Sequence, residues 1–268
     1  MKSLILAAGY ATRLYPLTEN QPKPLLEVGG KAILQHTLEK ISQIPEINEI
    51  FIVTNHRFYD HFRIWLNAYD APLTSVTSLP AYEKNISPQD SKKKTFLQKI
   101  TLIDDGTLNN NDRLGAVGDI HFTIKEQEIN EDILVIAGDN LFGFSLEKFL
   151  QFAKKTNASV VALHDLKDIE KVKKKYGVAT VEATKIIHFE EKPALPKSAL
   201  ASTACYFFKK EDLLQVEKAI QQGKADNPGD LIKWLVQISE VHGFVFKEHW
   251  FDVGSFESLN DAKAEYEQ

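Results

Sequence analysis

Residues 2–24 read KSLILAAGYATRLYPLTENQPKP, and the order of residue types in this stretch determines the fold class expected of the chain. Its first seven residues are aliphatic enough to form a strand buried on both faces of a sheet. Gly9 and Ala11 then leave room for backbone N–H groups to approach an anion, and Arg13 and Lys23 bring two fixed positive charges. The stretch predicts a strand followed by a loop that binds a triphosphate.

Two known phosphate-binding patterns do not fit this loop. No Gly-Lys-Ser/Thr follows the glycine, as a Walker loop requires, and the three spaced glycines of the dinucleotide fingerprint are absent. The remaining alternative is an ordinary strand-to-helix turn that carries a surface arginine and lysine.

The composition is that of an ordinary globular chain. Its 268 residues are 43% hydrophobic and 26% charged, which is enough for one large α/β domain and predicts no membrane span. The net charge of −5 argues against a nucleic-acid partner, because such a protein needs a basic face. Two lysine-rich segments, Lys92–Lys94 and Lys171–Lys175, are therefore expected to be solvated surface.

The single cysteine, Cys205, lies in an apolar run and is expected to be a buried, inert thiol. No internal disulfide can form, which fits a reducing cytoplasm. The apolar N-terminal run ends at Gly9 and is too short for the core of a signal peptide. We therefore expect a cytoplasmic protein whose first strand is this run.

The hydrophobic pattern predicts a mostly parallel sheet flanked by helices, followed by shorter antiparallel strands. Each long strand is separated from the next by enough chain for a crossover. The expected long strands are Lys2–Ala8, Glu49–Thr54, Asp132–Ala137 and Ser159–Leu163. The expected short strands are Val178–Thr184, Ile186–Glu191 and Thr203–Phe208. The expected helices are Ala32–Ile44, Phe144–Phe152, Lys210–Gln221, Pro228–Ser239 and Phe256–Glu267. The polar segment at about 67–113, with one strand near Lys99–Ile103, is expected to be an insert over the site.

Charged residues follow several of these runs, where ligands gather in open parallel sheets. Asp139 follows the run that ends at Ala137, and Asp252 precedes a glycine at the end of another run. Glu191 and Lys192 stand together before a proline. Either aspartate could instead cap the next helix, and Glu-Lys-Pro could be a surface turn.

Taken together, these segments resemble the sugar-1-phosphate nucleotidylyltransferase family. The family signature Leu-Ala-Ala-Gly-x-Gly-Thr-Arg-Leu-x-Pro-Leu-Thr, followed by Pro-Lys-Pro, stands here as Leu6–Thr18 and Pro22–Pro24. Ala11 replaces the second glycine, and its methyl group would require an adjustment of the loop if φ is positive there. The resemblance implies a Rossmann-like α/β fold of the nucleotide-diphospho-sugar transferase type, with a small antiparallel sugar-binding portion. It implies one domain over 1–268, with a nucleotide-binding part at about 1–140 and a sugar-binding part at about 141–268.

The resemblance also implies roles for individual residues. Asp139 and Asp252 would hold Mg²⁺, Glu191 would bind sugar hydroxyls, and Lys192 would bind the sugar phosphate. Arg13, Lys23 and Lys192 would be the catalytic cations. The nucleotide would contact Ala8, Gly9, Ala11, Thr12, Gly115 and Gly118, and the sugar would also contact Gly177 and Thr203.

The reaction implied is transfer of a nucleoside monophosphate from an NTP to a sugar 1-phosphate, which gives an NDP-sugar and pyrophosphate. Both substrates are anionic, so cations and Mg²⁺ are needed to bring them together. No general base is needed, because the attacking phosphate is already ionised. The resemblance implies that Leu114–Asp119 is a loop that lines the base pocket, called the base loop below. UTP and dTTP are the favoured donors. CTP and GTP stay as alternatives, because the glutamine that short thymidylyltransferases place in this region is absent here.

Other activities and a role for the insert stay open. A non-catalytic nucleotide-sugar binder, or a glycosyltransferase of related fold, would use a similar architecture. No Asp-x-Asp motif follows the run at Leu134–Ala137, which disfavours the glycosyltransferase. The insert would be a lid near the nucleotide, or else an arm that contacts another subunit of a homo-oligomer.

Overall fold

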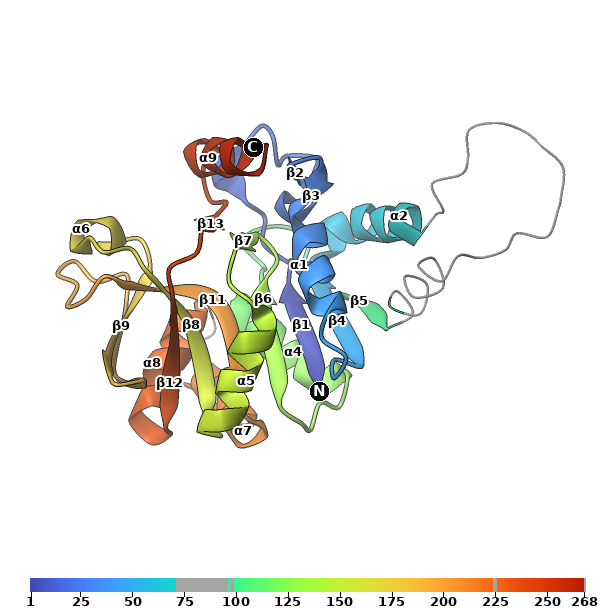
Figure 1. Ribbon diagram of the computed structural model, residues 1–268. Helices are drawn as coiled ribbons and strands as arrows, with labels where there is room; N and C mark the ends of the chain where they lie inside the picture. The colour runs from blue at the N-terminus through green and yellow to red at the C-terminus, as the bar shows by residue number, and fades with distance from the viewer. Residues whose placement is uncertain (71–95, 97–98, 224–225, 268) are drawn as a thin grey trace, which may run out of the picture.

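The computed structural model describes residues 1–70, 96, 99–223 and 226–267, and its centre is one mixed sheet (Figure 1). The sheet order among these residues is β5-β4-β1-β6-β11-β8-β12-β10-β9. Its strands are β1 (Lys2–Leu6), β4 (Glu49–Thr54), β5 (Ile100–Asp104), β6 (Ile133–Ala137), β8 (Ser159–Asp165), β9 (Gly177–Glu182), β10 (Lys185–Glu191), β11 (Leu200–Phe208) and β12 (Val241–Phe246). Two small pairs complete the strands: β2 (Glu27–Val28) with β3 (Lys31–Ala32), and β7 (Asn140–Phe142) with β13 (Trp250–Asp252).

The sheet is parallel in its first part and mixed in its second. Strands β5, β4, β1 and β6 are parallel neighbours, and β12 runs parallel to β8. Strand β11 is antiparallel to both β6 and β8, which it separates. The predicted short antiparallel strands therefore form no separate sheet. Residues before and after position 140 build one continuous sheet, because the late strand β11 pairs with β6.

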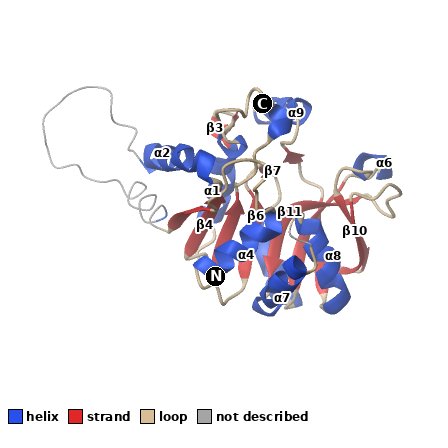
Figure 2. Ribbon diagram, turned by 180° about the vertical axis from the view of Figure 1, so that it is seen from behind, coloured by secondary structure: helices blue, strands red, loops and turns tan. Residues whose placement is uncertain are grey.

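Helices cover both faces of the sheet, so the fold has three layers: helices, sheet and helices. Helices α1 (Ile33–Ser42) and α5 (Leu146–Thr156) lie on one face (Figure 1), and α4 (Ala116–Glu126), α7 (Lys210–Gln221) and α8 (Pro228–Ile238) lie on the other (Figure 2). The peripheral helices are α2 (Tyr59–Asp70), α6 (Ile169–Val172) and α9 (Phe256–Tyr266), with short 3-10 turns η1 (Thr12–Leu14), η2 (Lys23–Leu25) and η3 (His56–Phe58). None of the helices in the described ranges is both long and apolar enough to cross a bilayer.

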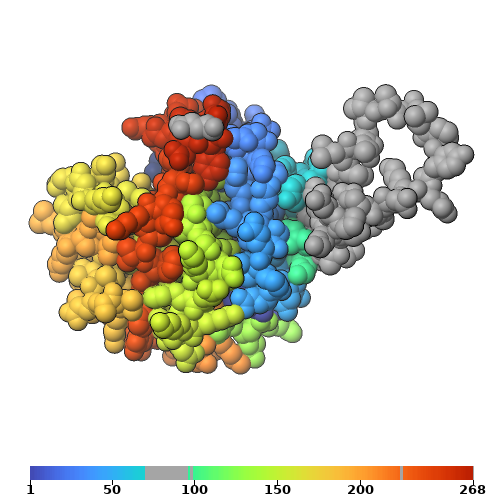
Figure 3. All heavy atoms as spheres, viewed as in Figure 1, coloured from blue at the N-terminus to red at the C-terminus, as the bar shows by residue number. Residues whose placement is uncertain are grey.

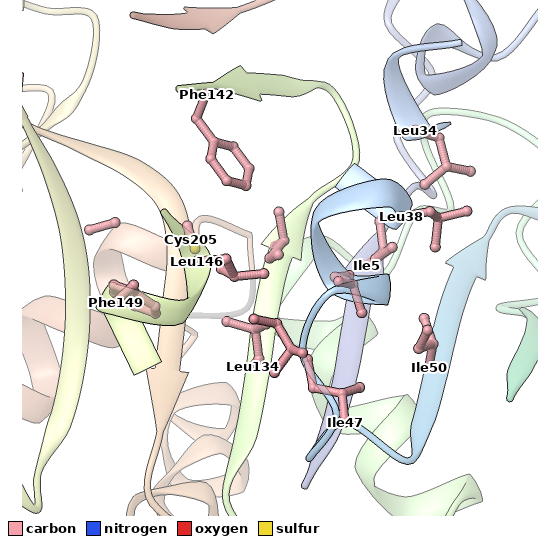
Figure 4. Packing of buried hydrophobic residues seen from close by; sticks show 14 of the residues in the cluster. Ile5, Leu34, Leu38, Ile47, Ile50, Leu134, Phe142, Leu146, Phe149 and Cys205 are labelled. Atoms are coloured by element: carbon pink, nitrogen blue, oxygen red, sulfur yellow. The ribbon is translucent and has the colours of Figure 1, made fainter. Parts of the chain in front are cut away.

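The core between the sheet and the α1/α5 layer is packed from aliphatic and aromatic side chains (Figure 4). Ile5 of β1 and Leu38 of α1 are fully buried, and Phe149 of α5 packs against Phe244 of β12 with 5.6 Å between the ring centroids. Burial of each such side chain stabilises the fold by about 1.5–3 kcal/mol. Cys205 is buried in the same cluster, and burial raises the pKa of its thiol. The expectation of a buried thiol is confirmed.

The C-terminal helix packs against the N-terminal part of the chain, as the space-filling view shows (Figure 3). Leu259 and Ala262 of α9 share a buried cluster with Leu14, Leu26 and Val28. Because Leu14 belongs to the predicted phosphate loop, α9 supports that loop from behind.

The segment at about 67–113 is an insert only in part, and the strand expected near Lys99–Ile103 is present. The region expected as an insert begins inside α2, and its later part, Ile100–Asp104, is the edge strand β5. The residues at 71–95 and 97–98, which include Lys92–Lys94, lie outside the described residues. Lys171, Lys174 and Lys175 are exposed as expected, and Lys175 also lines a cavity described below.

Candidate active site

A cavity of about 360 Å³ lies at the carboxyl ends of the central strands. This is the edge where ligands gather in open α/β sheets. Its wall contains most of the residues predicted for the site from the sequence: Ala8, Gly9, Arg13, Lys23, Gly115, Asp139, Gly177, Glu191, Lys192, Thr203 and Asp252. The chain thus brings together residues that are more than 200 positions apart.

Three predicted nucleotide contacts lie outside this wall. Ala11 adopts the left-handed conformation at φ 48°, so the strained loop foreseen for this position is present. Its carbonyl accepts from Thr18 Oγ1 at 2.8 Å, which fixes the shape of the loop. Thr12 begins η1 and is exposed. Gly118 lies inside α4 and faces Leu114, because a Cβ at Gly118 would be 2.9 Å from the Leu114 Cβ. The predicted base loop therefore becomes helical at Ala116.

The phosphate end of the cavity combines two carboxylates with two cations. Asp139 follows β6 and forms an ion pair with Lys23 of η2. Asp252 ends β13, which pairs with β7 so that Asp252 lies opposite Asn140. The guanidinium of Arg13 lies close enough to Asp252 to favour its ionised form. Four charges from four separate segments therefore meet at one point.

The charges of these groups are strongly coupled. Burial by itself would raise the pKa of Asp139, but Lys23 and the amide of Asn140 hold that pKa below its usual value. Burial, and then the negative charge of Asp139, raise the pKa of Asp252 to about 6. Two carboxylates that repel each other in this way form a site where binding of a cation is favourable.

This donor set fits a Mg²⁺ ion. Magnesium binds hard oxygen ligands and usually takes one or two carboxylates, completing its shell with water and substrate phosphates. Among the described residues no group of three or more His, Cys, Asp or Glu side chains is arranged to hold a metal. The pair Asp139 and Asp252 therefore suits a metal that is shared with a phosphate-bearing substrate.

A further part of the cavity wall is built around Glu191, the last residue of β10, and the neighbouring Lys192 lies close enough to Asp252 to favour its ionised form. Its carboxylate lies against two glycines, since a Cβ at Gly177 would be 2.9 Å from Oε2 and a Cβ at Gly229 only 1.8 Å. Burial raises the pKa of Glu191, and Lys192 partly opposes that shift. Lys192 Nζ lies 3.4 Å from Glu191 Oε1. Lys192 is half exposed, so its ammonium remains accessible to a ligand.

Thr203 lies in β11 where the register of pairing with β8 shifts. Its hydroxyl donates to the Ala162 carbonyl of β8 at 3.0 Å and so gives that carbonyl a hydrogen-bond partner. Ala204 beside it has φ 52°. A bulge of this kind turns a strand toward a site, and Thr203 lines the cavity as part of that bulge.

Several wall residues were missed at the level of sequence. Asp105 follows β5, and Asp119 lies in the first turn of α4. Gly229 starts α8, far from Glu191 in the chain. Arg113 donates three hydrogen bonds to the Asp226 carboxylate, at 3.0, 3.1 and 3.3 Å, and these connect the segment before α4 to the segment before α8. Only Asp105 carried a signal, because it ends an apolar run at the same sheet edge as the predicted residues.

Nearly the whole length of the chain is similar in sequence to known proteins. A family model described as nucleotidyl transferase matches residues 2–268. The bifunctional protein GlmU of Methanocaldococcus jannaschii is 30% identical over 257 residues, which cover 95% of this chain and 51% of the relative. A Sulfolobus acidocaldarius protein provisionally named mannose-1-phosphate guanyltransferase is 27% identical over 259 residues, covering 95% of this chain and 60% of the relative. The chain spans little more than half the length of the curated relatives it matches.

Solved structures share the fold at low sequence identity. A Bacillus anthracis protein provisionally named glucose-1-phosphate thymidylyltransferase, solved with sucrose, superposes with a TM-score of 0.78 at 24% identity and covers 100% of this chain and 96% of its own. A UDP-glucose pyrophosphorylase complexed with UDP-glucose gives a TM-score of 0.76 at 22% identity and covers 99% and 97%. These likenesses confirm the predicted fold class.

Proposed function

The chain belongs to the nucleotidyl transferase family, and from this premise we propose that it transfers a nucleoside monophosphate from an NTP to a sugar 1-phosphate, with Mg²⁺. The products would be an NDP-sugar and pyrophosphate. The proposal is carried by one observation: Lys23, Arg13, Asp139 and Asp252 meet in one cavity, and Glu191 and Lys192 line the same cavity beside them.

The main obstacle to the reaction is repulsion between two anionic substrates. Arg13 and Lys23 would bind the triphosphate, because both line the cavity at the end of β1 and β6. When bound, Mg²⁺ would be held by Asp139 and Asp252 and would offset negative charge on the reacting phosphates. Lys23 now neutralises Asp139 and would be released toward the α-phosphate.

The sugar phosphate would bind beside these charges, at Glu191 and Lys192. The Glu191 carboxylate would accept hydrogen bonds from sugar hydroxyls, and Lys192, with Lys175 at the rim, would bind the attacking phosphate. Holding both substrates in one cavity favours in-line displacement of pyrophosphate by proximity alone. No proton needs to be removed from the attacking oxygen.

The proposed function does not include a particular donor base. The expectation of UTP or dTTP rests on resemblance to thymidylyl- and uridylyltransferases, whereas one relative is named for guanyl transfer. The donor is therefore proposed here only as a nucleoside triphosphate, and the acceptor only as a sugar 1-phosphate.

The test is a matrix of five nucleoside triphosphates against glucose, mannose and amino-sugar 1-phosphates with Mg²⁺, measured as pyrophosphate release. Asp139→Asn and Asp252→Asn should each lower kcat/KM by at least about 10²-fold while the protein stays folded. Asp261→Asn, an exposed change on α9, is the matched control. Full activity of Asp139→Asn would contradict the proposed metal site. Nucleotide-sugar binding with no pyrophosphate release from any pair would instead favour a non-catalytic binder.

A further inference from the structure

Two buried carboxyl groups lie at the end of the cavity away from the predicted sugar site. Asp105 directly follows β5 and is 9% exposed, and Asp119 in the first turn of α4 is 6% exposed. Both line the cavity together with Gly9. Strands β5 and β6 are separated by β4 and β1, so Asp105 lies three strand spacings, about 14 Å, from the position where Asp139 follows β6.

Asp105 is held in place by the hydrogen bonds that it accepts, which partly oppose the rise that burial causes in its pKa. Its Oδ1 accepts from the Thr107 backbone N–H at 2.7 Å and from the Thr107 hydroxyl at 2.8 Å. Because that hydroxyl donates to Asp105, the Tyr10 hydroxyl must donate to Thr107, at 3.0 Å. Tyr10 belongs to the phosphate loop, so the loop and Asp105 are connected by hydrogen bonds.

Asp119 has an oxygen that could accept a further hydrogen bond. Its Oδ1 is shielded from solvent and receives no hydrogen bond from any described residue. Burial, and then the charge of Asp105, raise the pKa of Asp119 to about 8, and its carboxyl group bonds to that of Asp105. The two groups therefore share one proton near neutral pH. The shared proton lies between the two carboxyl groups and leaves other oxygens, Asp119 Oδ1 among them, able to accept hydrogen bonds from a ligand. The pair as a whole keeps one negative charge.

From this arrangement we infer that the Asp105–Asp119 pair reads the nucleobase and selects a triphosphate whose base carries an amino group, with guanine as the best fit. The inference rests on the proposed function and replaces the expectation of UTP or dTTP. Carboxylates recognise amino groups on bases. Guanine presents two neighbouring donors, its ring N–H and its amino group, to match two acceptor oxygens.

Uracil and thymine fit the same pair poorly. Their single ring donor is flanked by two carbonyl oxygens, which would face carboxyl oxygens without hydrogen between them. A buried polar group left unpaired costs about 1–3 kcal/mol. The negative pair would also repel phosphate, so it favours binding of the base at this end and of the phosphates near Arg13 and Lys23.

The first measurement is binding of each of GTP, ATP, CTP, UTP and dTTP to the intact protein by calorimetry, without a sugar phosphate. An amino-bearing base, GTP first, should bind about 10- to 100-fold more tightly than UTP or dTTP, as expected of a well-formed base contact. Tighter binding of UTP or dTTP by the unaltered protein would overturn the inference, whatever the variants do.

The second measurement uses Asp119→Asn. The asparagine amide adds a donor and removes the shared proton, so the preference for the amino-bearing base should fall about 10-fold or more, with UTP gaining relative to GTP. Glu126→Gln, an exposed change on the same helix, is the control and should leave the preference unchanged. Asp105→Asn provides a second variant if Asp119→Asn is poorly folded. An unchanged preference in folded variants of both aspartates would overturn the inference.

The outcomes separate this inference from the proposed function. Selective binding of GTP that Asp119→Asn abolishes, without pyrophosphate release for any sugar phosphate, would support base reading and contradict the transferase. Pyrophosphate release with UTP as the best donor, unaffected by Asp119→Asn, would support the transferase and contradict base reading.

Discussion

At the scale of single residues, the site depends as much on missing side chains as on charged ones. Glu191 can face the cavity only because Gly177 and Gly229 leave space for its carboxylate. Gly229 lies in the first turn of α8, where alanine would otherwise stabilise the helix by about 0.5–1 kcal/mol. Its retention as glycine is therefore explained by the close approach of Glu191.

Gly229→Ala should displace the Glu191 carboxylate, because the new Cβ would lie 1.8 Å from Oε2. We expect KM for the sugar 1-phosphate to rise about 10-fold, the cost of one lost charged hydrogen bond, while nucleotide binding stays within about twofold. Steady-state kinetics and nucleotide calorimetry measure the two quantities.

A double-mutant cycle with Glu191→Ala provides the control. If Gly229→Ala acts through Glu191, it should add little in the Glu191→Ala background, since contacting residues are not additive. Full additivity of the two effects on KM would show that the alanine acts elsewhere.

At the scale of elements, strand ends and helix starts position the chemistry. Asp252 ends β13, and three residues later Ser255 caps α9 with a capping box: the Ser255 hydroxyl accepts from the Ser258 N–H at 3.2 Å, and the Ser258 hydroxyl accepts from the Ser255 N–H at 3.1 Å. The Gly254 N–H also donates to the Ser258 hydroxyl, at 3.1 Å. The cap thus holds the short segment that follows a predicted metal ligand.

Ser255→Ala removes the acceptor of the capping box and should lower the free energy of unfolding by about 1 kcal/mol. In a chain of this size the corresponding fall in Tm is about 2–4 °C. Differential scanning calorimetry measures the change, and Asn260→Ala, exposed on the same helix, should not lower Tm. An unchanged Tm for Ser255→Ala would mean that α9 is held by its packing on Leu14 and Leu26 alone.

At the scale of the whole molecule, the two predicted parts are joined by the middle of the sheet. Strand β11 comes from the second part of the chain and pairs with β6 of the first along Cys205–Phe208. A separate opening of either part would break this central pairing and leave the edge of β6 unpaired.

We therefore expect the two parts to unfold together. Native-state hydrogen exchange should give the same opening free energy for β4 (Glu49–Thr54) and β8 (Ser159–Asp165), within about 1 kcal/mol, and urea unfolding should be a single transition. Opening of β8 at a much lower free energy than β4 would show that the second part unfolds independently.

The sequence by itself determined the fold class, most strands and helices, and eleven of the residues that line the cavity. Local chemistry carried this information: apolar runs specify buried strands, and charged residues directly after them gather at one sheet edge. Helix α7 has the predicted bounds, and α1 ends three residues before Pro45. Gly118, predicted to contact the nucleotide, lies in a helix and not in a loop, because α4 begins two residues earlier, at Ala116.

Only the tertiary structure decided what depends on contacts between distant segments. The insertion of β11 between β6 and β8, the room that Gly229 gives Glu191, and the meeting of Asp105 with Asp119 each join residues whose spacing in the chain carries no periodic signal. The charge state of Asp119 follows the same rule. From the sequence alone an aspartate is expected to be ionised at neutral pH. Burial of Asp119 beside a second carboxyl group makes it retain a proton there.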